Sequence, residues 1–319
     1  MACVSILGAG AMGCLWAAHL HQAFLSKPEH AIQFLSTRAD APGKLEFSLS
    51  SPFLSDQQSR FKLELAVRFP HELTPATKTQ PHIILLCTKS YHAFAAVQKL
   101  KPFLNEHTYL VLFQNGLGSQ HRILDAFPGI PIFAAVSTEG VNRQAKGHLV
   151  HAGKGLTRIG SLNEAARETH GLEHCLSVLR QPGITLQPET NIWPALWEKL
   201  AINCAINPFT AILNCPNGEI KDRSLFKKNW PELKRELNTM LELAGVKRSN
   251  DELEAYVLQV IEKTRTNISS MLQDVRAERK TEIEDINGFA ARFLAEKKLN
   301  HRINNALYKQ VIELEKGYL

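Results

Sequence analysis

Three polar side chains occur at helical spacing in an otherwise apolar segment of the second half of the chain. Lys199, Asn203 and Asn207 stand at positions i, i+4 and i+8, so on a helix they lie on one face. The residues between them are small or apolar, which predicts that these polar groups meet partners, water or a ligand. Because desolvation lowers the pKa of a lysine, Lys199 is a candidate general acid. A buried structural network that pairs Lys199 with an acid is the alternative.

A glycine-rich segment near the start of the chain indicates nucleotide chemistry. Residues 8–13 follow an apolar run and open an amphipathic stretch. In this context the first glycine permits a tight turn, the second lets the backbone approach a pyrophosphate, and the third lets the helix pack on the strand. Free N–H groups at the helix start attract phosphates. The segment therefore predicts dinucleotide binding, and a simple tight turn is the alternative. The candidate cofactor-binding residues are Gly8, Ala9, Gly10, Ala11, Met12 and Gly13.

The end of the second predicted strand distinguishes between NAD and NADP. An Asp or Glu there would bind the ribose 2′-hydroxyl of NAD, but residues 34–38 read Phe-Leu-Ser-Thr-Arg. Arg38 can pair with the 2′-phosphate of NADP, and Ser36 or Thr37 can donate further hydrogen bonds. We therefore expect NADP(H) as the cofactor. The alternative is that Arg38 is an ordinary surface arginine.

Two further loops follow predicted strands at the edge where open α/β sheets bind ligands. Lys89, in residues 87–90, would lie beside the cofactor phosphates or adenine. Asn115, in residues 114–118, offers an amide donor and an acceptor, and its neighbouring glycines allow close backbone approach. A solvated lysine and a hairpin-type turn are the alternatives, and we favour function for Asn115.

The pattern along the chain places these residues on an α/β fold. Apolar β-like runs alternate with helical stretches in the first half, which is typical of a Rossmann-type, doubly wound parallel sheet. From residue 191 onward the periodicity is helical. We expect a Rossmann-type domain in residues 1–189 and an all-α C-terminal domain in residues 190–319. The expected strands are residues 3–7, 32–36, 82–87, 109–113, 132–136, 149–159 and 184–186, and the expected helices of the first domain are residues 11–24, 91–104 and 164–179.

Composition excludes several classes of protein. The 319 residues favour two domains, and the net charge of +6 suits anionic ligands. Basic residues alternate with acidic ones in the charged segments, so nucleic-acid binding is not expected. No apolar run is long enough for a membrane span. The six cysteines sit singly in apolar contexts without zinc-ligand spacing, so we expect reduced, buried thiols, no metal site and a cytoplasmic location.

Two long segments resemble the ketopantoate reductases, which are 2-dehydropantoate 2-reductases. Residues 196–219 read LWEKLAINCAINPFTAILNCPNGE, and residues 268–289 read ISSMLQDVRAERKTEIEDINGF. Together with the GAGAMG start and the Asn-Gly pair at 115–116, the resemblance extends over nearly the whole chain. Residues 44–78 and 162–181 show no matching motif, so nothing is transferred there.

The resemblance implies NADPH-dependent reduction of 2-dehydropantoate to (R)-pantoate in pantothenate and coenzyme A biosynthesis, by a monomer or homodimer. It implies that Lys199 is the catalytic acid and that Glu282 orients Lys199 and the nicotinamide end of the cofactor. Asn115 would contact the cofactor near the reacting centre. The residues that it assigns to the substrate are Asn203, Asn207, Asn217 and Ser270.

The second of these segments poses a geometric problem. Ser270 and Glu282 are twelve residues apart, so on one straight helix they would be separated by about 18 Å. We therefore expect a bend or break, with Ser270 near the substrate carboxylate and Glu282 following a loop at residues 279–281.

Two other functions stay open. One is a dehydrogenase for a β-hydroxy acid or a sugar phosphate, and the other is an NADP(H)-sensing protein without catalysis.

Overall fold

The computed structural model describes residues 2–53, 60–145, 147–181 and 183–319. The chain forms two compact units. The first comprises residues 1–114 and 119–192, and the second comprises residues 115–118 and 193–319. The short segment 115–118 therefore belongs to the unit of the C-terminal helices, whereas the residues on either side of it belong to the first unit.

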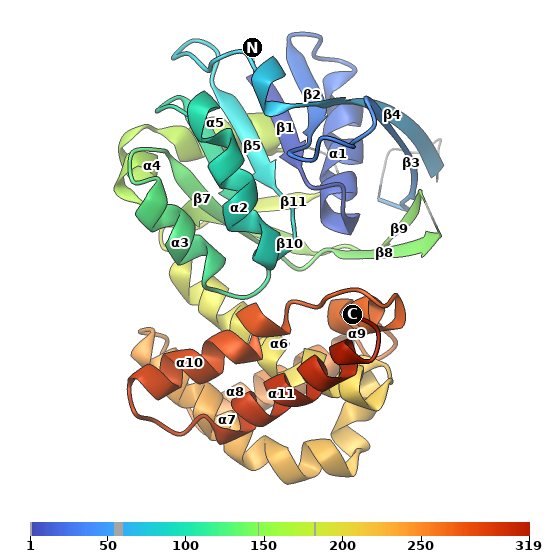
Figure 1. Cartoon of the computed structure of the whole chain (residues 1–319), viewed down its shortest axis with the longest axis vertical. Helices are drawn as coiled ribbons and strands as arrows, with labels where there is room; N and C mark the ends of the chain where they lie inside the picture. Colours follow the sequence, from blue (N-terminus) through green and yellow to red (C-terminus); the bar gives the residue numbers. More distant parts are fainter. Residues whose placement is uncertain (1, 54–59, 146, 182) are drawn as a thin grey trace. The chain divides into compact units, whose positions relative to one another are not determined.

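A single mixed sheet forms the centre of the first unit (Figure 1). Among the described residues it has eleven strands in the order β11-β10-β7-β6-β5-β1-β2-β4-β3-β9-β8. The strands are β1 (Ala2–Leu7), β2 (His30–Leu35), β3 (Lys44–Ser50), β4 (Arg60–Arg68), β5 (His82–Leu86), β6 (Thr108–Leu112), β7 (Ile132–Ser137), β8 (Gly140–Ala145), β9 (His148–Gly153), β10 (Leu156–Ser161) and β11 (Thr185–Pro188).

The middle of this sheet is the predicted doubly wound core. Strands β7, β6, β5, β1 and β2 are parallel neighbours, and each coincides with an expected strand to within two residues at either end. The chain moves from β1 to β2 in one direction and from β5 through β6 to β7 in the other. Right-handed crossovers therefore place α1 (Ala11–Phe24) on one face and α2 (Ser90–Leu100) and α3 (Ser119–Ala126) on the opposite face. The reversal lies between β1 and β5, where such sheets bind ligands.

The edges of the sheet depart from a purely parallel arrangement. β10 is antiparallel to β7, β3 is antiparallel to β4, and β8 is antiparallel to β9. Residues 44–78, in which the sequence shows no motif, contain β3 and β4. β4 alternates buried and exposed residues over much of its length, as expected for a strand with one solvated face.

Two predicted helices of the first unit are shorter than expected. The helix expected at 164–179 is divided into α4 (Glu164–Glu168) and α5 (Gly171–Leu179). His170 lies between them with φ 50°, a left-handed conformation that a continuous α-helix cannot contain. The helix expected to reach residue 104 ends at Leu100, and a 3-10 turn, η2 (Lys101–Phe103), follows. Pro102 lacks the N–H that would continue the α-helical hydrogen bonding.

The regular elements in the described part of the second unit are all helical, as expected. The α-helices are α6 (Trp193–Leu213), α7 (Ser224–Leu243), α8 (Asn250–Lys263), α9 (Ser270–Arg276), α10 (Asn287–Glu296) and α11 (Arg302–Lys316), and 3-10 turns are η3 (Asn217–Asp222) and η4 (Ile283–Asp285). α6 packs against α7, α8, α9 and α11, so it is the central helix of this unit. None of the described helices is long and apolar enough to span a membrane.

α6 continues through Pro208 to Leu213. Proline cannot donate to the carbonyl four residues earlier, which belongs to Cys204. The side chain of Asn287 replaces this donor, because its Nδ2 donates to Cys204 O at 3.2 Å and also to Asn304 Oδ1 at 3.0 Å. The buried carboxylate of Glu236 then accepts from Asn304 Nδ2 at 2.8 Å. This buried network connects α6, α7, α10 and α11.

All six cysteines are free. Four of them are buried as expected, namely Cys14, Cys175, Cys204 and Cys215. The expectation is wrong for Cys3, in β1, and for Cys87, which directly follows β5, because both are half-buried.

Candidate active site

The glycine loop connects β1 to α1 and lies beside the end of β5. Gly8 has φ 114°, and a Cβ there would lie 2.6 Å from Thr88 N. A Cβ on Gly13 would lie 2.0 Å from Gly8 O. Packing of the protein itself therefore requires both glycines. A Cβ on Gly10, in contrast, would meet only Cys87 O at 3.8 Å, an ordinary contact, so the open backbone at this position is free to approach a ligand.

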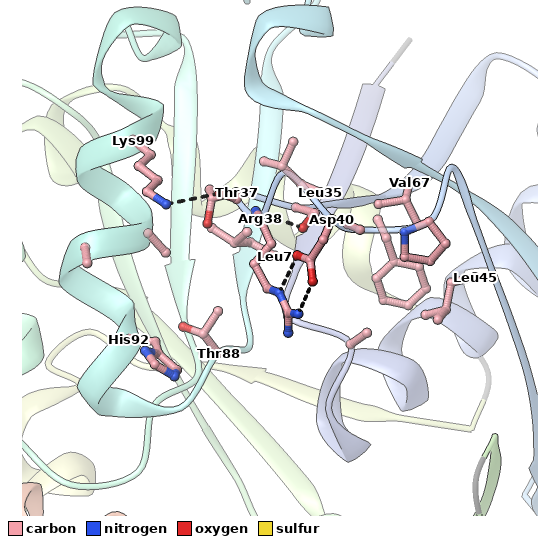
Figure 2. Close-up of a pocket in the computed structure, with 18 residues that line it drawn as sticks. Leu7, Leu35, Thr37, Arg38, Asp40, Leu45, Val67, Thr88, His92 and Lys99 are labelled. Carbon is pink, nitrogen blue, oxygen red and sulfur yellow. Dashed lines mark hydrogen bonds and ion pairs between the residues drawn. The ribbon is translucent and has the colours of Figure 1, made fainter.

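A cavity of about 580 Å³ adjoins this loop (Figure 2). Gly8 and Ala9 line it from the loop, and Arg38 lines it from the segment that follows β2. Thr88 lines it from the β5–α2 connection, and His92 lines it from the first turn of α2. Ser36 and Thr37 line it as well. The structure thus brings the predicted glycine loop and the predicted NADP arginine to one cavity. Lys89, half-buried at the start of α2, is not among the described residues that line it.

Arg38 forms an exposed, two-pronged ion pair with Asp40, which also lines this cavity. Its Nε donates to Asp40 Oδ1 at 3.0 Å, and its Nη2 donates to Asp40 Oδ2 at 2.6 Å. The hydrogen bonds and charge of Arg38 lower the pKa of Asp40. Asp40 lies two residues after Arg38, beyond the strand tip that the NAD and NADP motifs describe, so the sequence motif did not indicate it.

Arg143 is a further residue that the sequence did not indicate. It lies in β8, and its Nη2 donates to Ala9 O in the glycine loop at 3.2 Å. The contact crosses 134 residues of sequence, so no local pattern predicts it. It brings a cation to the loop that is expected to bind phosphates.

In the second unit, Lys199 lies in α6 and is half-buried. Burial lowers the pKa of Lys199 to about 8, and the negative charge of Glu282 acts in the opposite direction. Both effects follow from position, because removal from water disfavours the ammonium and a neighbouring carboxylate favours it. The result is a lysine that is largely protonated at neutral pH and able to release its proton readily.

Glu282 also contacts the predicted cofactor residue Asn115. Asn115 Nδ2 donates to Glu282 Oε2 at 3.3 Å. The backbone of segment 115–118 is held beside η4, since Leu117 N donates to Asp285 O at 2.9 Å. Gly116 has φ 78°, and a Cβ there would lie 2.2 Å from Asp285 O. The glycine at position 116 therefore permits a close approach between two backbone segments of the protein, at Gly116 and Asp285.

The predicted substrate residues of α6 and η3 differ in burial. Asn203 is half-buried, whereas Asn207 is buried. Asn217, at the start of η3, is also buried and donates from Nδ2 to Thr264 Oγ1 at 2.9 Å. Its Oδ1 is buried and accepts no hydrogen bond from any residue that the structure describes. Such an oxygen is costly to bury unless a donor reaches it, which fits a place in a ligand site.

Two adjacent serines at the start of α9 have different environments. Ser269 is the buried N-cap residue, and its Oγ accepts from Leu272 N at 3.1 Å and lies 2.6 Å from Thr210 Oγ1. Ser270, the predicted substrate residue, is exposed. α9 ends at Arg276 and Glu278 has φ 51°. Ser270 and Glu282 are therefore not on one helix, and the expected break is confirmed.

Comparison with known proteins agrees with this arrangement. A family model described as ketopantoate reductase PanE/ApbA matches residues 4–164, and the model of the ketopantoate reductase PanE/ApbA C terminal matches residues 191–315. The chain belongs to the ketopantoate reductase family. Among similar ketopantoate reductases, the 2-dehydropantoate 2-reductase of Vibrio cholerae serotype O1 is 30% identical over 99% of this chain and 98% of its own length. That of Shigella flexneri is 32% identical over 99% and 96%.

Solved structures show the same fold as this ketopantoate reductase family member. A PanE/ApbA family ketopantoate reductase from Ralstonia eutropha JMP134 has a TM-score of 0.77 and 23% identity, with 99% of each chain covered. A ternary structure of D-mandelate dehydrogenase with NADH and anilino(oxo)acetate has a TM-score of 0.82 and 19% identity, again with 99% covered. The same fold therefore occurs in a ketopantoate reductase and in a D-mandelate dehydrogenase.

Proposed function

We propose that this protein reduces the C2 ketone of 2-dehydropantoate to (R)-pantoate with NADPH, a step of pantothenate and coenzyme A biosynthesis. The relatives named above are 2-dehydropantoate 2-reductases that align over nearly their whole length. The observation that carries the proposal is the surroundings of Lys199. Burial lowers its pKa to about 8 while Glu282 favours its protonated form, as a proton donor at neutral pH requires.

The residues of the first unit fit NADP(H). Gly10 would let the pyrophosphate approach the start of α1, and Gly8 and Gly13 would permit the turn and the helix packing that form this loop. Arg38 would pair with the 2′-phosphate. Lys89 is assigned to the phosphates or adenine, and Asn115 to the nicotinamide end. When bound, NADPH supplies the hydride that is transferred to C2 of the substrate.

The residues of the second unit bind the keto acid and supply the proton. Lys199 Nζ donates a proton to the carbonyl oxygen as that oxygen gains negative charge, so the ketone becomes a secondary alcohol. The charge of Glu282 favours the protonated form of Lys199. Its carboxylate also accepts a hydrogen bond from the Asn115 amide and so orients that side chain. The hydroxyl and carboxylate ends of the substrate are assigned to Asn203, Asn207, Asn217 and Ser270. Residues 1–189 would thus serve as the NADP-binding domain and residues 190–319 as the substrate-binding and catalytic domain.

An NADPH-oxidation assay with a small panel of keto acids tests the proposal. The panel contains ketopantoate, other 2-keto acids, a β-keto acid and a sugar phosphate, and each is also tried with NADH. Turnover of ketopantoate at the highest kcat/KM is expected. Preference for another acid would replace the substrate, and binding of NADPH without turnover of any member would favour a sensing role.

We also propose that the protein works in the cytoplasm as a monomer or homodimer. A structurally similar ketopantoate reductase from Staphylococcus aureus is described as dimeric, at a TM-score of 0.73 and 19% identity. Sedimentation velocity over a range of protein concentrations distinguishes the two states.

A further inference from the structure

A second cavity adjoins the segment that follows β2. It has a volume of about 430 Å³, and its walls include Phe69, Pro70 and His71 beside the 36–39 segment and Lys99. Four residues line both this cavity and the larger one. They supply two hydroxyl groups, a guanidinium and an ammonium, namely Ser36, Thr37, Arg38 and Lys99. This is a set of donors suited to an anion.

Lys99 reaches this place from the last turn of α2. Its Nζ donates to Thr37 O at 3.1 Å, across 62 residues of sequence, and Figure 2 shows the side chain extending from the helix toward Thr37. An ammonium group has three N–H bonds, and the Thr37 carbonyl accepts one of them. The hydrogen bond therefore holds the ammonium at the backbone of Thr37, the residue before Arg38, while it keeps donors for a ligand.

Asp40 lines the larger cavity and opposes these cations. Its two oxygens accept from Nε and Nη2 of Arg38, which is the two-pronged geometry that phosphate oxygens adopt on a guanidinium. A ligand phosphate must therefore compete with Asp40 for Arg38. Lys99 makes a hydrogen bond to a neutral carbonyl instead, so its charge is less compensated.

We propose that Lys99 is a second cation that recognises the 2′-phosphate of NADP(H), and that Asp40 weakens this recognition by competing for Arg38. The inference rests on the proposed NADP(H) site and extends it to two residues with opposite effects. Preference for NADPH over NADH then depends on three charges, of Arg38, Lys99 and Asp40, two of which lie outside the strand tip that sequence motifs describe.

Binding of adenosine 2′,5′-bisphosphate and of AMP tests the role of Lys99, because the two ligands differ only in the 2′-phosphate. Calorimetric titration of Lys99→Met is expected to show binding about tenfold weaker for the bisphosphate and nearly unchanged for AMP. Lys99→Arg should restore most of the loss. The matched control is Lys101→Met, since Lys101 is exposed in η2 and outside the described lining of both cavities. An equal effect on both ligands, or none, would overturn the proposal.

Asp40→Asn provides the opposite test. Removal of the competing charge should tighten the bisphosphate about threefold or more and leave AMP unchanged, and the gain should shrink at high salt because these charges are exposed. Weaker binding would show that Asp40 positions Arg38 instead of competing for it. These titrations contain no keto acid. If the unmodified protein prefers the bisphosphate over AMP but does not turn over ketopantoate, the proposed function alone is contradicted. If it turns over ketopantoate but Lys99→Met keeps the same preference for the bisphosphate over AMP, the inference alone is contradicted.

Discussion

Asn115 and Glu282 are 167 residues apart in sequence, and the amide of Asn115 donates to the carboxylate of Glu282 at 3.3 Å. The same carboxylate raises the pKa of Lys199 against the larger effect of burial. One acid therefore connects a residue assigned to the cofactor with the residue assigned to proton transfer. A change at any of the three is expected to affect the other two.

Replacement of Lys199 by alanine should lower kcat for ketopantoate reduction by about 100-fold or more, the usual contribution of a general acid. In the unmodified protein the lysine is protonated below its pKa of about 8, so the rate should fall as pH rises through this value. The variant should lack that alkaline limb in steady-state kinetics measured from about pH 6 to 10. Lys263→Ala, an exposed lysine of α8, serves as the control. Near-normal turnover with the same limb would return Lys199 to a structural role.

Glu282→Gln should move the alkaline limb to lower pH. The charge of Glu282 raises the pKa of Lys199, so its removal lowers that pKa and reduces the protonated fraction at neutral pH. Glutamine retains an oxygen that can accept from Asn115. Complete pH profiles of kcat separate this shift from a uniform loss of rate, and an unmoved limb would show that Glu282 does not act through Lys199.

NADPH should be preferred over NADH, and Arg38→Ala should narrow that preference by about tenfold or more, as expected for loss of a charge-assisted pair with phosphate. Asp40 binds the guanidinium in this structure, so Arg38→Ala removes both the pair with phosphate and the competing pair with Asp40. The measured change in preference is the net effect of these two losses. Fluorescence titration with NADPH and with NADH gives the ratio of the two dissociation constants. Equal affinity of the unmodified protein for NADH and NADPH would remove Arg38 from cofactor recognition.

Asn203→Ala and Ser270→Ala should raise KM for ketopantoate and leave the affinity for NADPH nearly unchanged. Ser269→Ala provides a contrast at the neighbouring position, because Ser269 caps α9 and contacts Thr210. Its loss should lower the free energy of unfolding by about 1 kcal/mol. Thermal unfolding and NADPH titration of all three variants check these assignments. A large loss of cofactor affinity in Asn203→Ala or Ser270→Ala would reverse them.

Asn287→Ala should destabilise the protein by about 1–3 kcal/mol, the usual cost of leaving buried hydrogen-bonding groups without partners. The side chain replaces the donor that Pro208 lacks and also reaches Asn304. Urea unfolding measures the loss, and Asn305→Ala, at a half-buried position of α11, should cost less than about 0.5 kcal/mol. Equal small effects of both variants would contradict the importance of the network.

Much of the fold could be predicted from the sequence because its patterns are local. The amphipathic stretch at residues 11–24 is α1 with the same limits, and the five central strands lie where apolar runs occur. The helical spacing of Lys199, Asn203 and Asn207 is a property of a few turns, and α6 does contain all three. Periodicity and the glycine spacing depend on backbone geometry within a short segment, so they can be interpreted without a structure.

Other features required the tertiary structure, since they depend on residues far apart in the chain. Nothing local shows that Asn115 meets Glu282, that Lys99 reaches Thr37, or that Arg143 reaches Ala9. Ser269 and Ser270 look alike in sequence, but only packing against Thr210 makes the first structural. A left-handed residue at 170 divides a helix whose pattern is continuous. The sequence by itself thus determined the central strands, α1, α6 and the types of side chain at the site, whereas packing decided which side chains meet and how burial lowers the pKa of Lys199.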